Sequence, residues 1–141
     1  MIRETISDIL KTASEIKTFK ERTQYLKGHK DLTPLRTVIE YAYSPKHTFD
    51  LPEGTPPFKQ QELADDQMGA LYTEARRLYI FTKEGMPDLK PFTRESRFIE
   101  LLEYVHPEDA KLLCAVKDKS LPYKNLTPKL MEAVWPGITD G

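Results

Sequence analysis

The chain has 141 residues, of which 39% are hydrophobic and 30% are charged. This length and composition are typical of one soluble globular domain with its own core. No apolar run approaches the roughly 20 residues that span a bilayer, and the amino-terminal segment lacks the apolar stretch of a signal peptide. A single cysteine, Cys114, excludes an internal disulfide framework. We therefore expect a cytoplasmic protein in which this thiol is buried and inert.

Charge is unevenly distributed along the chain, although the net charge is only −1. Residues 1–46 carry nine Lys or Arg against six Asp or Glu, residues 47–110 carry seven against 13, and residues 111–141 carry five against three. Two basic ends therefore flank an acidic middle. The pattern is explained equally well by charged helix faces that only contact solvent and by a surface that binds a polyanion. If the chain contacts a polyanion, we expect the contact to use the two ends.

Three helices are expected in the first 44 residues. The inner face of the first is predicted by apolar residues at helical spacing, namely Ile2, Ile6, Ile9, Leu10 and Ala13. A Thr-x-x-Glu capping box at residues 18–21 predicts a second helix that ends at Gly28. Thr33 followed by Pro34 predicts that Thr33 caps a third helix, which stops before Pro45.

A Pro-rich loop is expected at residues 44–64, which contain four prolines and one glycine. The segment "HTFDL" within it is compatible with a short extended piece. Because long ordered loops in small domains usually pack or bind something, we expect this one to lie along the surface, anchored by Phe49, Leu51 and Phe58.

A long helix is expected next, from Asp65 or Asp66 to Gly85. Its predicted inner face comprises Met68, Leu71, Tyr72, Ala75, Leu78 and Tyr79.

Three further helix starts are expected at Thr93, at His106-Pro107 and at Thr127-Pro128. The last of these helices is expected to bury Leu130, Met131 and Val134. Together these signals predict an all-α fold, in which residues 1–141 form a single compact domain of about seven helices with a long Pro-rich loop.

Motifs that support catalysis are absent from the sequence. It has no Gly-rich phosphate loop, Cys-x-x-Cys, His-Glu-x-x-His or Gly-x-Ser-x-Gly. The three histidines, His29, His47 and His106, lie far apart, and their spacing gives a metal site no support. We therefore expect a protein that is not an enzyme and that holds no cofactor or metal.

Two lysine-rich stretches are candidate anion-binding sites. Backbone N–H groups at a helix start favour anions, and nearby lysines add charge, so such a stretch can hold phosphates without reading bases. The first stretch carries Lys17, Lys20, Arg22, Lys27, Lys30 and Arg36. The second carries Lys117, Lys119, Lys124 and Lys129 around the expected N-cap Thr127.

Three sequence segments carry a resemblance to phage proteins. The amino-terminal "ISDILKTASEIKTFKERTQYLKGHKDLTPLRTVIEYAYSP" resembles the opening of the ATP-dependent DNA ligases of tailed bacteriophages. The carboxy-terminal "NLTPKLMEAVWPGI" resembles the end of the DNA-binding domain of the same ligases. From "VHPEDAKLLCAVKDKSL" to "LTPKLMEAVWPG" the chain also resembles a family of short tailed-phage proteins.

The resemblance implies a helical domain that grips the backbone of duplex DNA across the minor groove, in the cytoplasm of an infected host cell. By position, Thr127 matches a Ser at a helix start in the ligases, and Asn125 stands where they place a Gly in the DNA-facing turn. Because no Lys-x-Asp-Gly motif occurs, ligase catalysis is not expected. We therefore expect DNA to be contacted by Lys117, Lys119, Lys124, Asn125, Thr127 and Lys129. Lys27 and Lys30 are expected to add further contacts.

A protein–protein adaptor is the alternative function. It would act on phage or host replication or transcription proteins, and its contact surface would be the acidic middle of the chain with the loop at residues 49–58. Neither function involves a membrane partner.

Overall fold

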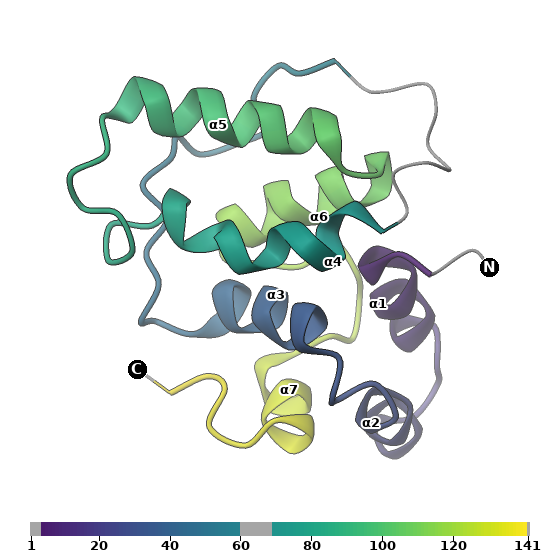
Figure 1. Cartoon of the computed structure of the whole chain (residues 1–141). Helices are drawn as coiled ribbons and strands as arrows, with labels where there is room; N and C mark the ends of the chain where they lie inside the picture. Colours follow the sequence, from purple (N-terminus) through teal and green to yellow (C-terminus); the bar gives the residue numbers. More distant parts are fainter. Residues whose placement is uncertain (1–3, 60–68, 141) are drawn as a thin grey trace.

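Helix α6 (Pro107–Lys117) lies at the centre of the fold. It contacts α1 (Ile6–Ser14), α3 (Thr33–Tyr43) and α5 (Pro91–Tyr104) (Figure 1). A helix that is covered on most sides is expected to bury residues around most of its circumference. Those of α6 are Asp109, Ala110, Leu112, Leu113, Cys114, Val116 and Lys117.

The computed structural model describes residues 4–59 and 69–140, and the all-α prediction is confirmed. The other elements in this part of the chain are α2 (Phe19–Lys27), α4 (Ala70–Glu74), the 3₁₀-helix η2 (Ala75–Phe81) and α7 (Pro128–Val134). Strand geometry among the described residues is limited to one isolated bridge between Phe49 and Thr82. Within these same ranges, no helix combines the length and the apolar character needed to cross a bilayer.

Three predicted helix starts have the expected side-chain caps. Thr18 Oγ1 accepts a hydrogen bond from the Glu21 N–H at 3.2 Å, and Thr127 Oγ1 accepts one from the Leu130 N–H at 3.2 Å. His106 Nδ1 accepts from the Glu108 N–H at 3.1 Å, so this histidine is a helix cap, as expected. Each cap satisfies a backbone donor that has no partner within its helix.

The predicted caps Thr33 and Thr93 are wrong. Helix α3 starts one residue earlier, because the Leu32 carbonyl accepts the first helical hydrogen bond from Arg36 N–H at 3.2 Å. Helix α5 starts at Pro91, with Lys90 as the capping position. In both helices proline within the first two positions fixes a helical φ, and no side-chain cap is present.

The long helix expected up to Gly85 is confirmed only over Ala70–Glu74, because Ala75–Phe81 is a 3₁₀-helix and no helix reaches Gly85. Its expected start at Asp65 or Asp66, and Met68, lie outside the described residues, as does Ile2 of the first helix. The chain changes from α4 to η2 at Ala75, and a 3₁₀-helix has three residues per turn. Ala75, Leu78 and Phe81 are therefore buried at spacings of three, whereas Tyr79 is 44% exposed.

Gly85 is required by close packing rather than by a helix end. A Cβ atom at this position would lie 2.2 Å from the Tyr79 carbonyl oxygen.

The Pro-rich loop lies along the surface, as expected for its described residues. Phe49, Leu51 and Phe58 are half-buried and pack against the core, and the Phe49 bridge confirms the short extended piece. A buried guanidinium holds this loop, since Arg94 is only 1% exposed and pairs with Asp50. Arg94 also donates to the carbonyls of Ile80 and Met86, so it joins the loop, η2 and α5.

A buried carboxyl joins α6 to the start of α1. Asp109 is fully buried; its Oδ1 accepts from the Ser7 N–H at 3.0 Å. Among the described residues no group donates to its Oδ2. Burial raises the pKa of Asp109 from 3.8 to about 6, against the hydrogen bonds from Ser7 and the nearby His106, which lower it.

Asp109→Asn is expected to remove a pH dependence of stability. Because the folded-state pKa is raised, the carboxyl contributes stability below about pH 4 and loses it as the pH rises through about 6. A shift of this size corresponds to about 3 kcal/mol. In urea titrations between pH 4 and 7, the wild-type free energy of unfolding should fall relative to that of Asp109→Asn. Parallel pH profiles for the two proteins would contradict this assignment.

Candidate nucleic-acid interface

Helices α2 and α7 pack side by side and run in the same direction. At their starts, Lys129 Nζ lies 5.8 Å from the centroid of the Phe19 ring. At their ends, Trp135 Nε1 donates to the Lys30 carbonyl at 3.0 Å. Both helices lie at the lower end of the molecule in Figure 1. The pairing therefore joins the two basic ends of the sequence.

A second set of hydrogen bonds closes the turn between α1 and α2 against the turn before α7. Asn125 Nδ2 donates to the Ser14 carbonyl at 3.1 Å. The Arg22 guanidinium donates to the carbonyls of Ile16 and Lys17, at 2.8 and 2.9 Å. These donors occupy carbonyls that follow α1, where the negative end of a helix would otherwise oppose an anion.

Six lysines remain exposed on or beside the two paired helices. We call this region the α2–α7 surface; its members are Lys17, Lys20, Lys27, Lys30, Lys124 and Lys129. The exposed acids in the same stretches are Glu15, Glu21 and Asp31. The carboxylate of Glu132, in α7, instead accepts from the N–H groups of Gly137 and Thr139. The surface is therefore basic, although the whole chain is slightly acidic.

The prediction that Lys117 contacts DNA is wrong. Its side chain is 2% exposed, and its Nζ donates to the Pro52 carbonyl at 2.8 Å and to Asp118 Oδ1 at 2.6 Å. The amine therefore anchors the Pro-rich loop to the end of α6. A buried charge needs such partners, because desolvation without them is costly.

Lys119 lies at the surface, but the three donors of its amine are taken by carbonyls of the protein, which does not support its predicted DNA contact. Its Nζ donates to the carbonyls of Tyr41, Ser44 and His47, at 2.8, 2.9 and 2.7 Å. These carbonyls lie in the last turn of α3 and just after it, where a cation is favoured. Burial lowers the pKa of the Lys119 amine, and the nearby Glu84 acts in the opposite direction.

Lys119 also ends α6 in a left-handed conformation, with φ of 63°. The Lys119 N–H bonds to the Val116 carbonyl and the Ser120 N–H to the Ala115 carbonyl, which is the Schellman pattern of helix termination. Glycine is usual at this position because a Cβ atom disfavours positive φ. The three amine hydrogen bonds offset that cost.

Asn125 and Thr127 have structural roles as well. Asn125 adopts a φ of 66°, which an asparagine tolerates, but its amide is directed to Ser14 rather than left available to a ligand. Thr127 Oγ1 caps α7, Pro128 has no N–H, and the Leu130 N–H is taken by the cap. Within the first turn of this seven-residue helix, the Lys129 N–H is the donor left after the proline and the cap. The candidate interface therefore depends on lysine side chains.

Of the eight predicted contacts, only Lys117 is buried. Lys119, Asn125 and Thr127 are exposed but hydrogen-bonded within the protein, whereas Lys27, Lys30, Lys124 and Lys129 are exposed and lie on the α2–α7 surface. Lys17 and Lys20 belonged to the basic stretch in the sequence, but the sequence did not single them out as contacts. Phe19 was missed as a surface residue. It shares a helix face with the buried Thr23, so helical spacing alone does not indicate its exposure; its place at the first residue of α2 does.

The chain matches a known protein family. A model described as "Family of unknown function (DUF6433)" matches residues 9–123 of the 141. The chain belongs to this family. The part matched by DUF6433 contains α2 and α6 with Lys117 and Lys119, and it ends before α7. A search of curated proteins finds none that matches the chain.

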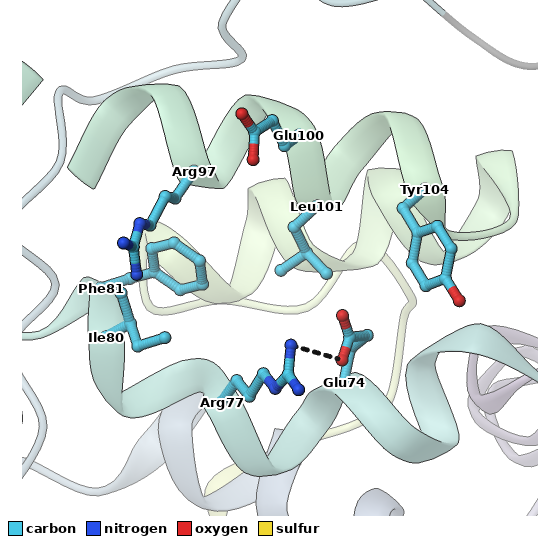
Figure 2. Close-up of a pocket in the computed structure, with 8 residues that line it drawn as sticks. All are labelled: Glu74, Arg77, Ile80, Phe81, Arg97, Glu100, Leu101 and Tyr104. Carbon is cyan, nitrogen blue, oxygen red and sulfur yellow. Dashed lines mark ion pairs between the residues drawn. The ribbon is translucent and has the colours of Figure 1, made fainter. Parts of the chain in front are cut away.

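A cleft lies between η2 and α5, in the acidic middle of the DUF6433 chain. Its volume is about 530 Å³, and its residues include the apolar Ile80, Phe81 and Leu101. Figure 2 shows Arg77 paired with Glu74 on one side. Arg97, Glu100 and the exposed Tyr104 lie on the α5 side. Two arginines and two glutamates balance in charge, so this cleft does not favour a polyanion.

Metal ligands do not gather anywhere in residues 4–59 and 69–140, where no three His, Cys, Asp or Glu side chains are grouped. His47 Nε2 lies 2.8 Å from Glu40 Oε2, and His29 Nδ1 lies 3.1 Å from the Tyr25 carbonyl.

Lys119→Met is expected to destabilise the protein, whereas Lys124→Met is not. The first variant removes three charge-assisted hydrogen bonds and leaves buried carbonyls without a partner, at a cost of about 2 kcal/mol. The second truncates an exposed lysine, for which a change within about 0.5 kcal/mol is usual. Urea unfolding of both variants checks this difference. Equal changes would show that the Lys119 amine is not a structural group.

Proposed function

We propose that this protein binds the phosphate backbone of duplex DNA, has no enzymatic activity and largely does not read base sequence. The observation that carries the proposal is the packing of α2 against α7. It places exposed lysines from both basic ends of the chain on or beside two adjacent helices. The resemblance to phage ligase DNA-binding domains supports the choice of duplex DNA and of contacts across the minor groove.

The lysines suit phosphate better than bases. Lysine is a flexible point charge, so it can neutralise phosphates at varied positions but does not define a base by paired hydrogen bonds. Binding that depends on phosphate neutralisation releases counterions and is strongly weakened by salt. If about four of the six lysines contact phosphates, the logarithm of the affinity should fall with the logarithm of salt concentration with a slope of about −4.

Lys124→Glu combined with Lys129→Glu is expected to abolish DNA binding. The double variant replaces two cations by two anions just before and at the start of α7, where Lys129 lies near the Phe19 ring of α2. Fluorescence anisotropy with a labelled duplex of about 20 base pairs at about 50 mM salt measures the effect. The matched control is Lys83→Glu with Lys90→Glu, which changes the net charge equally in the exposed connector before α5.

Two results would contradict the proposal. One is a wild-type protein that does not bind duplex at low salt. The other is an equal loss of affinity in the α7 variant and in the control, because net charge alone would then explain binding.

A protein–protein adaptor is the second candidate, and the cleft between η2 and α5 favours it. The cleft has an apolar base and balanced charges, and Tyr104, which is 59% exposed, lies at its side. The loop at residues 49–58 is less suited to this role than expected, because its aromatic side chains pack against the protein's own core. Absence of DNA binding at low salt, together with a partner whose capture is lost in Tyr104→Ala, would favour the adaptor.

A further inference from the structure

Phe19 is an aromatic side chain set among the lysines of the α2–α7 surface. It is the first residue of α2, its side chain is 42% exposed, and it lies outside the hydrophobic core. Exposed lysines flank it in sequence at positions 17 and 20. Lys129 comes from the other end of the chain and places its amine 5.8 Å from the ring centroid.

Contact with the backbone of an intact duplex gives this ring no partner. The faces of paired bases are covered by stacking on their neighbours, and phosphates interact with cations rather than with an aromatic face. A base that is not stacked within a duplex presents an open π-face, and aromatic rings next to basic groups bind such bases with little sequence preference. The Phe19 ring and the Lys129 amine together match one nucleotide, with the ring facing the base and the amine near its phosphate.

We propose that Phe19 is a stacking platform for an unpaired base, so that the α2–α7 surface prefers DNA with a single-stranded segment to fully paired DNA. This inference rests on the proposed function, since the lysines hold the backbone on either side of the ring. The ligand is a nucleic acid with at least one unstacked base, whether a single strand or a duplex with a single-stranded tail.

The position of Phe19 explains why the ring is available for this role. Thr23 and Leu26 supply the buried residues of α2. Thr18 caps the helix without help from the ring. The cation contact with Lys129 involves two exposed side chains, and such contacts are weak in water. An arriving base can therefore take the place of the amine over the ring while the amine pairs with a phosphate.

The experiment compares three labelled DNAs at about 50 mM salt, namely a blunt duplex, the same duplex with a single-stranded tail, and the tail alone. Wild-type protein is expected to bind the tailed duplex about ten-fold more tightly than the blunt one, which is within the range that one stacked base provides. Phe19→Leu should abolish that preference and leave blunt-duplex affinity within about two-fold, because the lysines are unchanged. Phe19→Trp should restore it.

The control is Phe92→Leu, which truncates the other strongly exposed phenylalanine, 80% exposed, at the start of α5. It should leave all three affinities unchanged. Fluorescence gives a second readout, because the tryptophan introduced by Phe19→Trp should be quenched by the tailed duplex more than by the blunt one. The native Trp135, only 6% exposed, provides the background to subtract.

Each outcome bears on one proposal. Lysine-dependent binding of all DNAs, with no preference for the tail or no effect of Phe19→Leu, overturns the stacking platform and leaves backbone binding intact. No binding of any DNA overturns both. Tighter binding of the tail alone than of the tailed duplex supports base stacking on Phe19 and identifies single-stranded DNA as the preferred ligand.

Discussion

The packing of α7 against α2 is the interaction on which the α2–α7 surface, and the function proposed for it, depends. It joins segments about a hundred residues apart through Trp135 Nε1 and the Lys30 carbonyl, which differ by 105 positions in sequence. Helix α7 is too short to be stable alone, and its side chains Leu130, Met131 and Val134 are buried in the common core. Without this contact, the lysines of the two basic ends of the chain would lie in two separate regions.

The same fold divides the cations of the chain into two groups. Arg94, Lys117 and Lys119 are turned to carbonyls and carboxylates of the Pro-rich loop and of the end of α3. They replace the regular hydrogen bonding that a loop of this length lacks. The lysines of α2 and α7, in contrast, have no such internal acceptors among the contacts described above. The proposed DNA binding therefore uses basic residues other than those that hold the Pro-rich loop and the end of α3.

The sequence predicted the elements whose signals are local. A capping side chain before a proline, as at Thr127, or three residues before an acid, as at Thr18, located these two helix starts correctly, whereas the same Thr-Pro pattern at Thr33 placed the start of α3 one residue late. The 3₁₀ segment was missed because a spacing of three coincides with a helical face until Tyr79 emerges into solvent. Lys117, Lys119 and Lys124 are equivalent in sequence. Their separation into inward and outward lysines depends on which carbonyls α3 and the loop leave open nearby, which is a tertiary property.

The central claim is that DNA contacts the α2–α7 surface and not the cleft between η2 and α5. Titration of the isotope-labelled protein with tailed duplex, followed by amide chemical shifts in NMR, tests this claim most directly. The account predicts that the perturbed amides lie in residues 14–30 and 124–135, and that those of residues 74–104 stay unchanged. Perturbations that centre on Arg77, Arg97 and Tyr104, or none at all, would contradict it.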